Sequence, residues 1–254
     1  MEEAREPEAP TPNELELGDV FDHIQQLRRS GNRDEARKVL ERATRAGLDV
    51  SFEWGLLLED LGQVRESVDW YLRSENPAAR FNAAFILYEQ GKWDTASHQF
   101  EWLLARDELP TNARRHLGDC YDELGNYELA EKHFRAGAAA MDHENSIAMY
   151  GNFLRMRGRW DEAREVLDEA EQKGFDVSFE YGCLLHDAGE LEGALAKYLE
   201  SNMSEAHMNA ALVLHDLGRD AESREQFLIA IDAGDAKAAR MYDDGRFFEN
   251  SSHE

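Results

Sequence analysis

Small and bulky apolar residues recur at spacings of three and four along most of the chain, on either side of regularly placed glycines. Around Gly125, for example, Leu117 and Tyr121 precede the glycine and Ala130 and Phe134 follow it, with polar residues between them. Residues at these spacings lie on one face of an α-helix. Glycine readily adopts the left-handed conformation that ends a helix. The pattern therefore predicts two amphipathic helices that meet at the glycine and pack on each other.

This helix–glycine–helix pattern occurs seven times, and successive glycines are separated by 29 to 34 residues. The seven glycines are Gly31, Gly62, Gly91, Gly125, Gly158, Gly189 and Gly218. A nearly constant period in this range is typical of repeat proteins, in which each helix pair packs on its neighbours. The chain shows no alternation typical of strands, so we expect an all-α fold of the α-solenoid type.

The repeats resemble those of the tetratricopeptide repeat family over roughly residues 17–234. In the third repeat, Ala83, Leu87, Gly91, Ala96 and Phe100 occupy the packing positions of the family motif. The resemblance implies a right-handed superhelix of about seven helix-turn-helix repeats. Five of the six intervals are shorter than 34 residues, and this shortening, with the small residues of segment 230–239, is similar to Sel1-like repeats.

The sequence also repeats with a second, longer period that spans several of these helix pairs. Residues 31–105 align without gaps to residues 158–232, at an offset of 127, and about 30 of the 75 aligned positions are identical. The simplest explanation is an ancestral duplication. The same offset places segment 236–249 where an eighth first helix would start, so we expect a C-terminal capping helix. Its residues Met241, Phe247 and Phe248 would cover the apolar surface of the last repeat.

These observations give a domain organisation. Residues 1–14 hold three of the five prolines, Pro7, Pro10 and Pro12, among glutamates, and we expect a disordered acidic tail. The superhelix occupies 15–249, and a short frayed tail, 250–254, follows. The repeats lie near 17–48, 49–75, 77–108, 111–142, 144–175, 176–202 and 204–234, with the cap at 236–249.

The charge of the chain narrows the choice of partners. There are 53 acidic and 28 basic residues, and the net charge is −25. This balance argues against binding to nucleic acid and to anionic membrane surfaces. The excess carboxylate has two explanations, which the sequence leaves open: solubility, especially in high salt, or attraction of a basic partner.

We infer the location of the protein from features that the sequence lacks. No apolar run approaches the ~20 residues of a membrane-spanning helix, and the first residues lack the pattern of a signal peptide. Cys120 and Cys183 lie two repeats apart and are expected to stay unpaired, as in a reducing compartment. We expect an acidic, cytoplasmic protein.

No motif for catalysis or cofactor binding is found: there is no phosphate loop, nucleophile elbow, His-Glu-x-x-His or Cys-x-x-Cys. His186 and His215 occupy matched positions in neighbouring repeats, each followed by an aspartate. Stacked helices are about 10 Å apart, which is far for ligands that must lie about 2 Å from one ion. We therefore expect no catalytic residues, no metal and no cofactor.

In tetratricopeptide repeats the first helix of each pair lines the concave face, and the resemblance implies the same here. The residues of those helices that lie off the packing stripe are aromatic in the second and third repeats and acidic in the fourth. The candidate partner-binding residues are Phe52, Phe81, Asn82, Phe85, Tyr88, Asp119, Asp122 and Asn209. Aromatic groups beside carboxylates suit a peptide with both apolar and basic residues. Alternatively, the phenylalanines only pack between adjacent repeats.

Asn82 and Asn209 are partners in the duplication. They resemble rungs of the asparagine ladder that holds a peptide backbone in some members of the family, although a local structural role is an equal alternative. We therefore expect a non-enzymatic scaffold or adaptor that binds a peptide or helix of a partner protein in the concave groove. The alternative is a regulatory or sensor subunit of a larger complex, whose ligand changes the curvature of the array.

Overall fold

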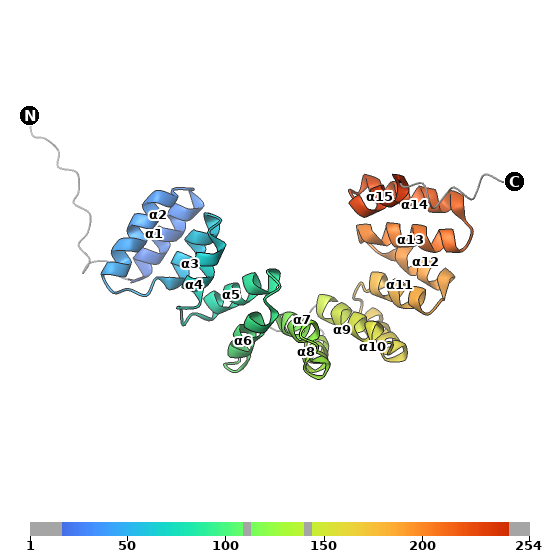
Figure 1. Ribbon diagram of the computed structural model, residues 1–254, viewed down its shortest axis with the longest axis horizontal. Helices are drawn as coiled ribbons and strands as arrows, with labels where there is room; N and C mark the ends of the chain where they lie inside the picture. Colours follow the sequence, from blue (N-terminus) through green and yellow to red (C-terminus); the bar gives the residue numbers. More distant parts are fainter. Residues whose placement is uncertain (1–16, 109–112, 140–143, 244–254) are drawn as a thin grey trace, which may run out of the picture. The chain divides into compact units, whose positions relative to one another are not determined.

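A computed structural model describes residues 17–108, 113–139 and 144–243, and every regular element in these ranges is a helix (Figure 1). The expected tails at 1–14 and 250–254, and Phe247 and Phe248, lie outside the described residues. The helices are α1 (Leu17–Arg29), α2 (Arg33–Arg45), α3 (Ser51–Asp60), α4 (Val64–Tyr71), α5 (Pro77–Glu89), α6 (Trp93–Leu104), α7 (Arg114–Glu123), α8 (Tyr127–Ala139), α9 (Glu144–Met156), α10 (Trp160–Gln172), α11 (Ser178–Asp187), α12 (Leu191–Glu200), α13 (Ser204–Asp216), α14 (Asp220–Asp232) and α15 (Ala236–Asp243).

The glycines end the first helix of each pair, as predicted. All seven have φ between 68° and 77°, in the left-handed region. At Gly125 the backbone N–H donates to Asp122 at 2.9 Å, and the N–H of Asn126 donates to Tyr121 at 2.8 Å. This pair of bonds is the Schellman motif, which satisfies the last carbonyls of a helix. We call the odd-numbered helices A helices and the even-numbered ones B helices.

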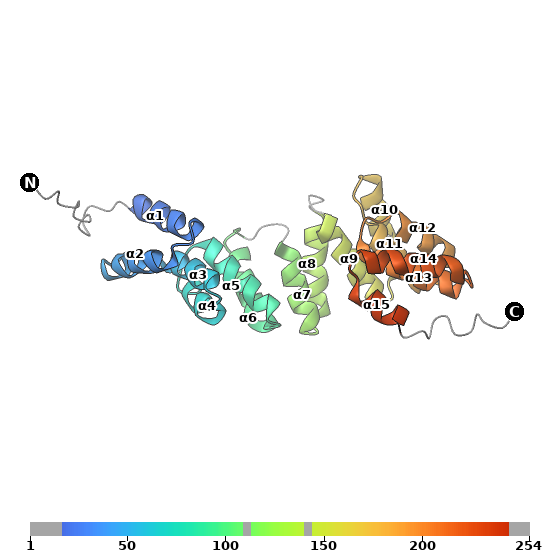
Figure 2. The ribbon, with the colours of Figure 1, turned by 90° about the horizontal axis from the view of Figure 1, so that it is seen from above.

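The chain divides into two compact units, an N-terminal unit, Met1–Ala130, and a C-terminal unit, Glu131–Glu254, with the division inside α8. Within the N-terminal unit each helix from α1 to α7 packs on the next, and α1 and α5 also contact α3. Within the C-terminal unit the helices from α9 to α15 pack in the same way, and α9 contacts α11 (Figure 2). This succession of neighbour contacts is that of an α-solenoid, and it confirms the predicted fold class.

Close approach of A and B helices depends on small residues. A Cβ atom added to Gly55 would overlap the ring of Tyr71, which is fully buried. In the duplicated position, a Cβ on Gly182 would lie 2.6 Å from the ring of Tyr198. Each glycine therefore provides the space that a tyrosine of the following B helix fills.

The last helix covers the end of the final repeat. Ala238 of α15 is buried, and Met241 and Tyr242 pack against a cluster that contains Phe227 and Ala230 of α14. The rings of Phe227 and Tyr242 lie 6.3 Å apart. A capping helix was predicted at this place, with Met241 in this role.

Candidate functional site

Three aromatic side chains follow one another along helix α5 in the N-terminal unit. The ring of Phe85 lies 6.5 Å from that of Phe81 and 6.3 Å from that of Tyr88, and both pairs are stacked. Spacings of three and four place them on one face of the helix. Phe85 is 38% exposed, whereas Phe81 and Tyr88 are half-buried. We call these three residues the α5 aromatic row.

His116 of α7 packs against the α5 aromatic row. Its ring centroid lies 5.4 Å from Phe85, 4.7 Å from Tyr88 and 6.0 Å from Phe100 of α6. The side chain is buried, its Nδ1 has no hydrogen-bond partner, and burial lowers its pKa to about 4. His116 is therefore neutral at physiological pH. The sequence analysis did not select it, although it occupies the position that Asn82 holds in the preceding repeat.

A carboxylate lies at the C-terminal end of the row. The hydroxyl of Tyr88 donates to Oδ2 of Asp119 on α7 at 2.9 Å. Burial raises the pKa of Asp119 to about 6, despite the opposing effects of the Tyr88 hydrogen bond and of Arg115. Asp122, one turn further along α7, is half-buried and raises that pKa further. The structure thus brings the predicted aromatic and acidic residues of the third and fourth repeats together.

The other two candidates in this unit contact a buried tyrosine. The ring of Phe52 on α3 lies 5.9 Å from that of Tyr71, and the side chain of Asn82 on α5 hydrogen-bonds to the Tyr71 hydroxyl. That hydroxyl donates to Glu59 at 2.7 Å. Asn82 therefore ties its own A helix to the preceding repeat.

Asn209 has the same surroundings in the C-terminal unit. Its side chain hydrogen-bonds to the hydroxyl of Tyr198, and its Nδ2 lies 4.0 Å from Sγ of Cys183. Tyr198 and Asn209 are the duplicates of Tyr71 and Asn82. Of the eight candidate residues, Asn209 alone belongs to the C-terminal unit.

Polar pairs join successive A helices near their C-terminal ends, and the sequence analysis missed them. Nε of Arg28 on α1 lies 2.6 Å from Oδ2 of Asp60 on α3. The duplicated pair, Arg155 on α9 and Asp187 on α11, is also bonded. The sequence does contain an indication of these pairs, because both partners of the first pair recur in the second at the same offset of 127 residues. Each pair neutralises an arginine and a carboxylate on neighbouring A helices.

The two histidines at matched positions each face an aspartate. Nε2 of His186 lies 3.8 Å from Asp216, and Nδ1 of His215 lies 3.0 Å from Asp220. Within the described ranges, no group of three or more His, Cys, Asp and Glu side chains could hold a metal ion. Both cysteines are free thiols.

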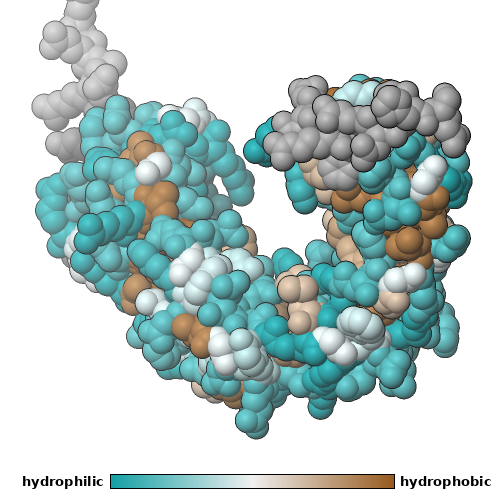
Figure 3. All heavy atoms as spheres, turned by 45° about the vertical axis from the view of Figure 1, so that its right-hand side comes forward, coloured by the Kyte–Doolittle hydropathy of each residue, from teal (hydrophilic) through white to brown (hydrophobic). Residues whose placement is uncertain are grey.

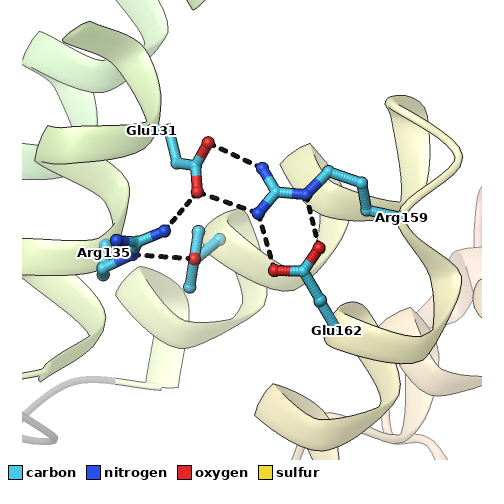
Figure 4. Close-up of polar contacts among 5 residues, drawn as sticks. Glu131, Arg135, Arg159 and Glu162 are labelled. Carbon is cyan, nitrogen blue, oxygen red and sulfur yellow. Dashed lines mark hydrogen bonds and ion pairs between the residues drawn. The ribbon is translucent and has the colours of Figure 1, made fainter. Parts of the chain in front are cut away.

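An arginine-centred network joins α8 to α10 within the C-terminal unit (Figure 4). Arg159 donates to Glu131 at 2.6 and 3.0 Å and to Glu162 at 2.7 and 2.6 Å. Arg135 also bonds Glu131 and donates to the Tyr150 hydroxyl at 3.1 Å. The guanidinium of Arg159 lowers the pKa of both glutamates. The network holds neighbouring repeats together and offers no free charge to a ligand.

The visible surface is largely hydrophilic, with separate apolar areas among the polar side chains (Figure 3). Across the described residues, no helix has both the length and the hydropathy to span a bilayer.

Comparison with known proteins agrees with this architecture. Two family models described as tetratricopeptide repeat match the sequence, one at residues 21–83 and 81–144 and the other at residues 148–169. The structure is similar to the crystal structure of a tetratricopeptide repeat protein from Parabacteroides merdae, with a TM-score of 0.65 and 16% identity over 87% of this chain and 94% of that chain. It is also similar to the C-terminal part of a TPR repeat-containing protein from Cytophaga hutchinsonii, with a TM-score of 0.55 and 14% identity over 71% of this chain and 78% of that chain.

At these identities the structural likeness concerns the fold alone. A search of the curated proteins gave no match. The family models together cover more than half of the chain, and the repeats that they match are the helix pairs described above. The chain therefore belongs to the tetratricopeptide repeat family.

Proposed function

We propose that this protein is a non-enzymatic scaffold or adaptor, and that its N-terminal unit binds a peptide or helix of a partner across helices α3, α5 and α7. Tetratricopeptide repeats in general mediate protein–protein interactions. The observation that carries the proposal is the exposed ring of Phe85 in the α5 aromatic row, next to the carboxylate of Asp119. A large aromatic group that is open to solvent beside a desolvated acid is a suitable anchor site for a partner.

The chemistry of these residues defines the partner. The aromatic row would receive an apolar side chain, and Asp119 and Asp122 would receive a lysine or arginine. Asp119 is hydrogen-bonded to a phenol rather than to a cation, so an incoming cation would offset the cost of its burial. The proposed contact set in this unit is Phe52, Phe81, Asn82, Phe85, Tyr88, Asp119 and Asp122.

Asn209 belongs to the corresponding surface of the C-terminal unit. Leu212 and His215 stand there in place of Phe85 and Tyr88. That surface lacks the stacked aromatic rings, so we assign the principal anchor to the N-terminal unit.

Selection of binding peptides from a random displayed library, with the full chain as bait, tests the proposal. We expect the enriched sequences to combine apolar with basic residues. In calorimetric titrations of such a peptide, the double variant Phe85→Ala, Tyr88→Ala should lose about 2 kcal/mol of binding free energy, or roughly 30-fold in Kd. Leu212→Ala, at the duplicated position of Phe85, is the matched control and should bind as the parent does.

Charge reversal tests the acidic half of the site separately. Asp119→Lys with Asp122→Lys should slow association and weaken its dependence on salt, because charge governs the rate of encounter more than the dwell time. Circular dichroism of every variant checks that the helices are retained. Peptides that bind folded parent and folded variants equally well would refute the assignment of this groove.

A further inference from the structure

A pair of stacked tryptophans forms a shallow pocket in the N-terminal unit, at a place that shares no residue with the α5 aromatic row. The rings of Trp54 on α3 and Trp70 on α4 lie 5.4 Å apart, with an interplanar angle of 20°. Nε1 of Trp54 donates to Oγ1 of Thr44 on α2 at 3.0 Å. Both indoles line a hollow of about 270 Å³, together with Glu41, Thr44 and Arg45. Trp70 is half-buried, so its ring is accessible from the surface.

The fold does not require this pocket. In the duplicated position of the C-terminal unit, Tyr181 and Lys197 stand in place of Trp54 and Trp70. Nζ of Lys197 lies 5.2 Å from the Tyr181 ring and 2.6 Å from Glu171, and the Tyr181 hydroxyl donates to Asp168 at 2.6 Å. A charged, internally satisfied network thus packs the same helices. The aromatic pocket of the N-terminal unit is an added feature, which favours a binding role.

Helix α2, which contributes three of the residues that line the pocket, is basic in an otherwise acidic chain. Helix α2 carries five basic against three acidic residues, so its net charge is +2, whereas the chain has a net charge of −25. Arg45 lines the pocket, where its guanidinium lies 3.5 Å from the carboxylate of Glu41 in an exposed ion pair, and the guanidinium of Arg73 lies 4.6 Å above the Trp70 ring. An occupant with flat or rigid apolar groups and negative charge would suit this site.

The chain itself supplies a segment of that composition. Residues 1–16 contain six glutamates and one arginine, a net charge of −5, and the prolines Pro7, Pro10 and Pro12. The segment joins α1 at Leu17. Because α1 and α2 pack as consecutive antiparallel helices, Leu17 lies at the same end of the pair as Arg45. At about 3.1 Å per residue for an extended proline-rich chain, Pro12 can reach about 15 Å from Leu17 and Pro7 about 30 Å.

We propose that residues 1–16 bind in the Trp54–Trp70 pocket of the same molecule. The prolines lie against the indole rings, and the glutamates lie beside Arg45 and Arg73. Proline-rich segments bind aromatic-lined grooves in this way because their extended conformation loses little entropy on binding. The covalent connection also makes binding intramolecular, so that a weak contact is sufficient to keep the pocket occupied.

Nuclear magnetic resonance of the ¹⁵N-labelled full chain tests this proposal. The five tryptophans give five indole N–H signals. The variants Trp54→Phe and Trp70→Phe each remove one signal and so identify the signals of the two pocket tryptophans. In the triple variant Pro7→Ser, Pro10→Ser, Pro12→Ser, we expect these two signals to shift. The signals of Trp93, Trp102 and Trp160 should stay in place. Ala4→Ser with Ala9→Ser keeps every proline and every charge and is the matched control, in which no signal should move.

A second measurement does not depend on the tail substitutions. Arg45→Glu with Arg73→Glu removes the positive charge at the pocket, and the backbone ¹⁵N relaxation of residues 2–16 should then report faster motion than in the parent. Identical Trp54 and Trp70 signals in the parent and the triple proline variant would overturn the proposal. So would shifts that disappear on dilution, because they would place the tail in the pocket of another copy.

Discussion

The two units of this protein are built on the same duplicated helix framework but differ in the side chains around it. Inside, the matched positions keep their roles: Gly55 and Gly182 each receive a tyrosine ring, and that tyrosine is Tyr71 in one unit and Tyr198 in the other. The asparagines that hold these hydroxyls are also duplicated.

Around this framework the N-terminal unit is more aromatic. It has Phe85 and Tyr88 on α5 where the C-terminal unit has Leu212 and His215, and it also has the tryptophan pair. Interior packing tolerates few changes of volume, whereas exposed positions are free to change. Phe85 and Tyr88, to which we assign the principal anchor, are positions at which the units differ, and the buried positions at which the units agree are the ones to which we assign stability.

The largest loss of stability should come from replacing the buried phenylalanines of the B helices. Phe100 and Phe227 are duplicated positions and are both fully buried. Replacing either with alanine leaves a cavity and should reduce the free energy of unfolding by about 3–5 kcal/mol, as measured by urea denaturation. A large cost in one unit and a negligible cost in the other would show that the two frameworks are not equivalent.

Filling the space beside Tyr71 and Tyr198 should cause smaller but still clear losses of stability. Gly55→Ala and Gly182→Ala would each push a methyl group into a tyrosine ring, and we expect both to destabilise by about 1–3 kcal/mol, less the gain in helix propensity. Gly151→Ala is the control, because its methyl group would lie 2.9 Å from the end of the flexible Leu167 side chain. Thermal unfolding curves should rank it as the mildest of the three.

Asp119 should make the N-terminal unit less stable as the pH rises. Its pKa is about 6 in the folded chain and near 3.8 in the unfolded chain, so the folded state binds more protons between these values. The stability that this group contributes is complete below pH 4 and is lost as the pH passes 6, and the loss between pH 4.5 and 7 is about 2 kcal/mol. In urea denaturation, Asp119→Asn should remove this difference between pH 4.5 and 7. An unchanged pH profile would contradict the burial of this carboxyl group.

The network of the C-terminal unit should respond to pH with the opposite sign. Arg159 lowers the pKa of Glu131 and Glu162 below the ordinary value of 4.5, so the folded state binds fewer protons than the unfolded state near that pH. The stabilisation is present above pH 4.5 and disappears as the pH falls through the lowered values. Arg159→Gln should therefore be less stable than the parent at pH 7, and the gap should close in acid.

The smallest loss of stability should come from breaking the ion pairs between A helices. Asp60→Asn and Asp187→Asn each break a duplicated, partly exposed pair with an arginine, and each should cost at most about 1 kcal/mol. Denaturation in 1 M salt should shrink the difference from the parent further. A cost as large as that of Phe100→Ala would mean that these pairs, and not the packing, hold successive repeats together.

Much of the fold could be read from the sequence because its signals are local. A glycine such as Gly125 ends a helix by its own conformational freedom, and spacings of three and four define a buried face within a single helix. The α5 aromatic row was found by the same reasoning, since Phe81, Phe85 and Tyr88 belong to one helix. The duplication then predicted which positions would match between the two halves.

What the sequence alone determined is thus the succession of helix pairs, their joints and the faces that each helix presents. Only the tertiary structure decided which side chains meet across repeats. It placed His116 against Phe85 and Tyr88, gave Asn82 the hydroxyl of Tyr71 as a partner and buried Asp119 enough to raise its pKa to about 6. These properties depend on contacts between residues of different helices and on the water that those contacts exclude, and no local pattern of residue types encodes either of them.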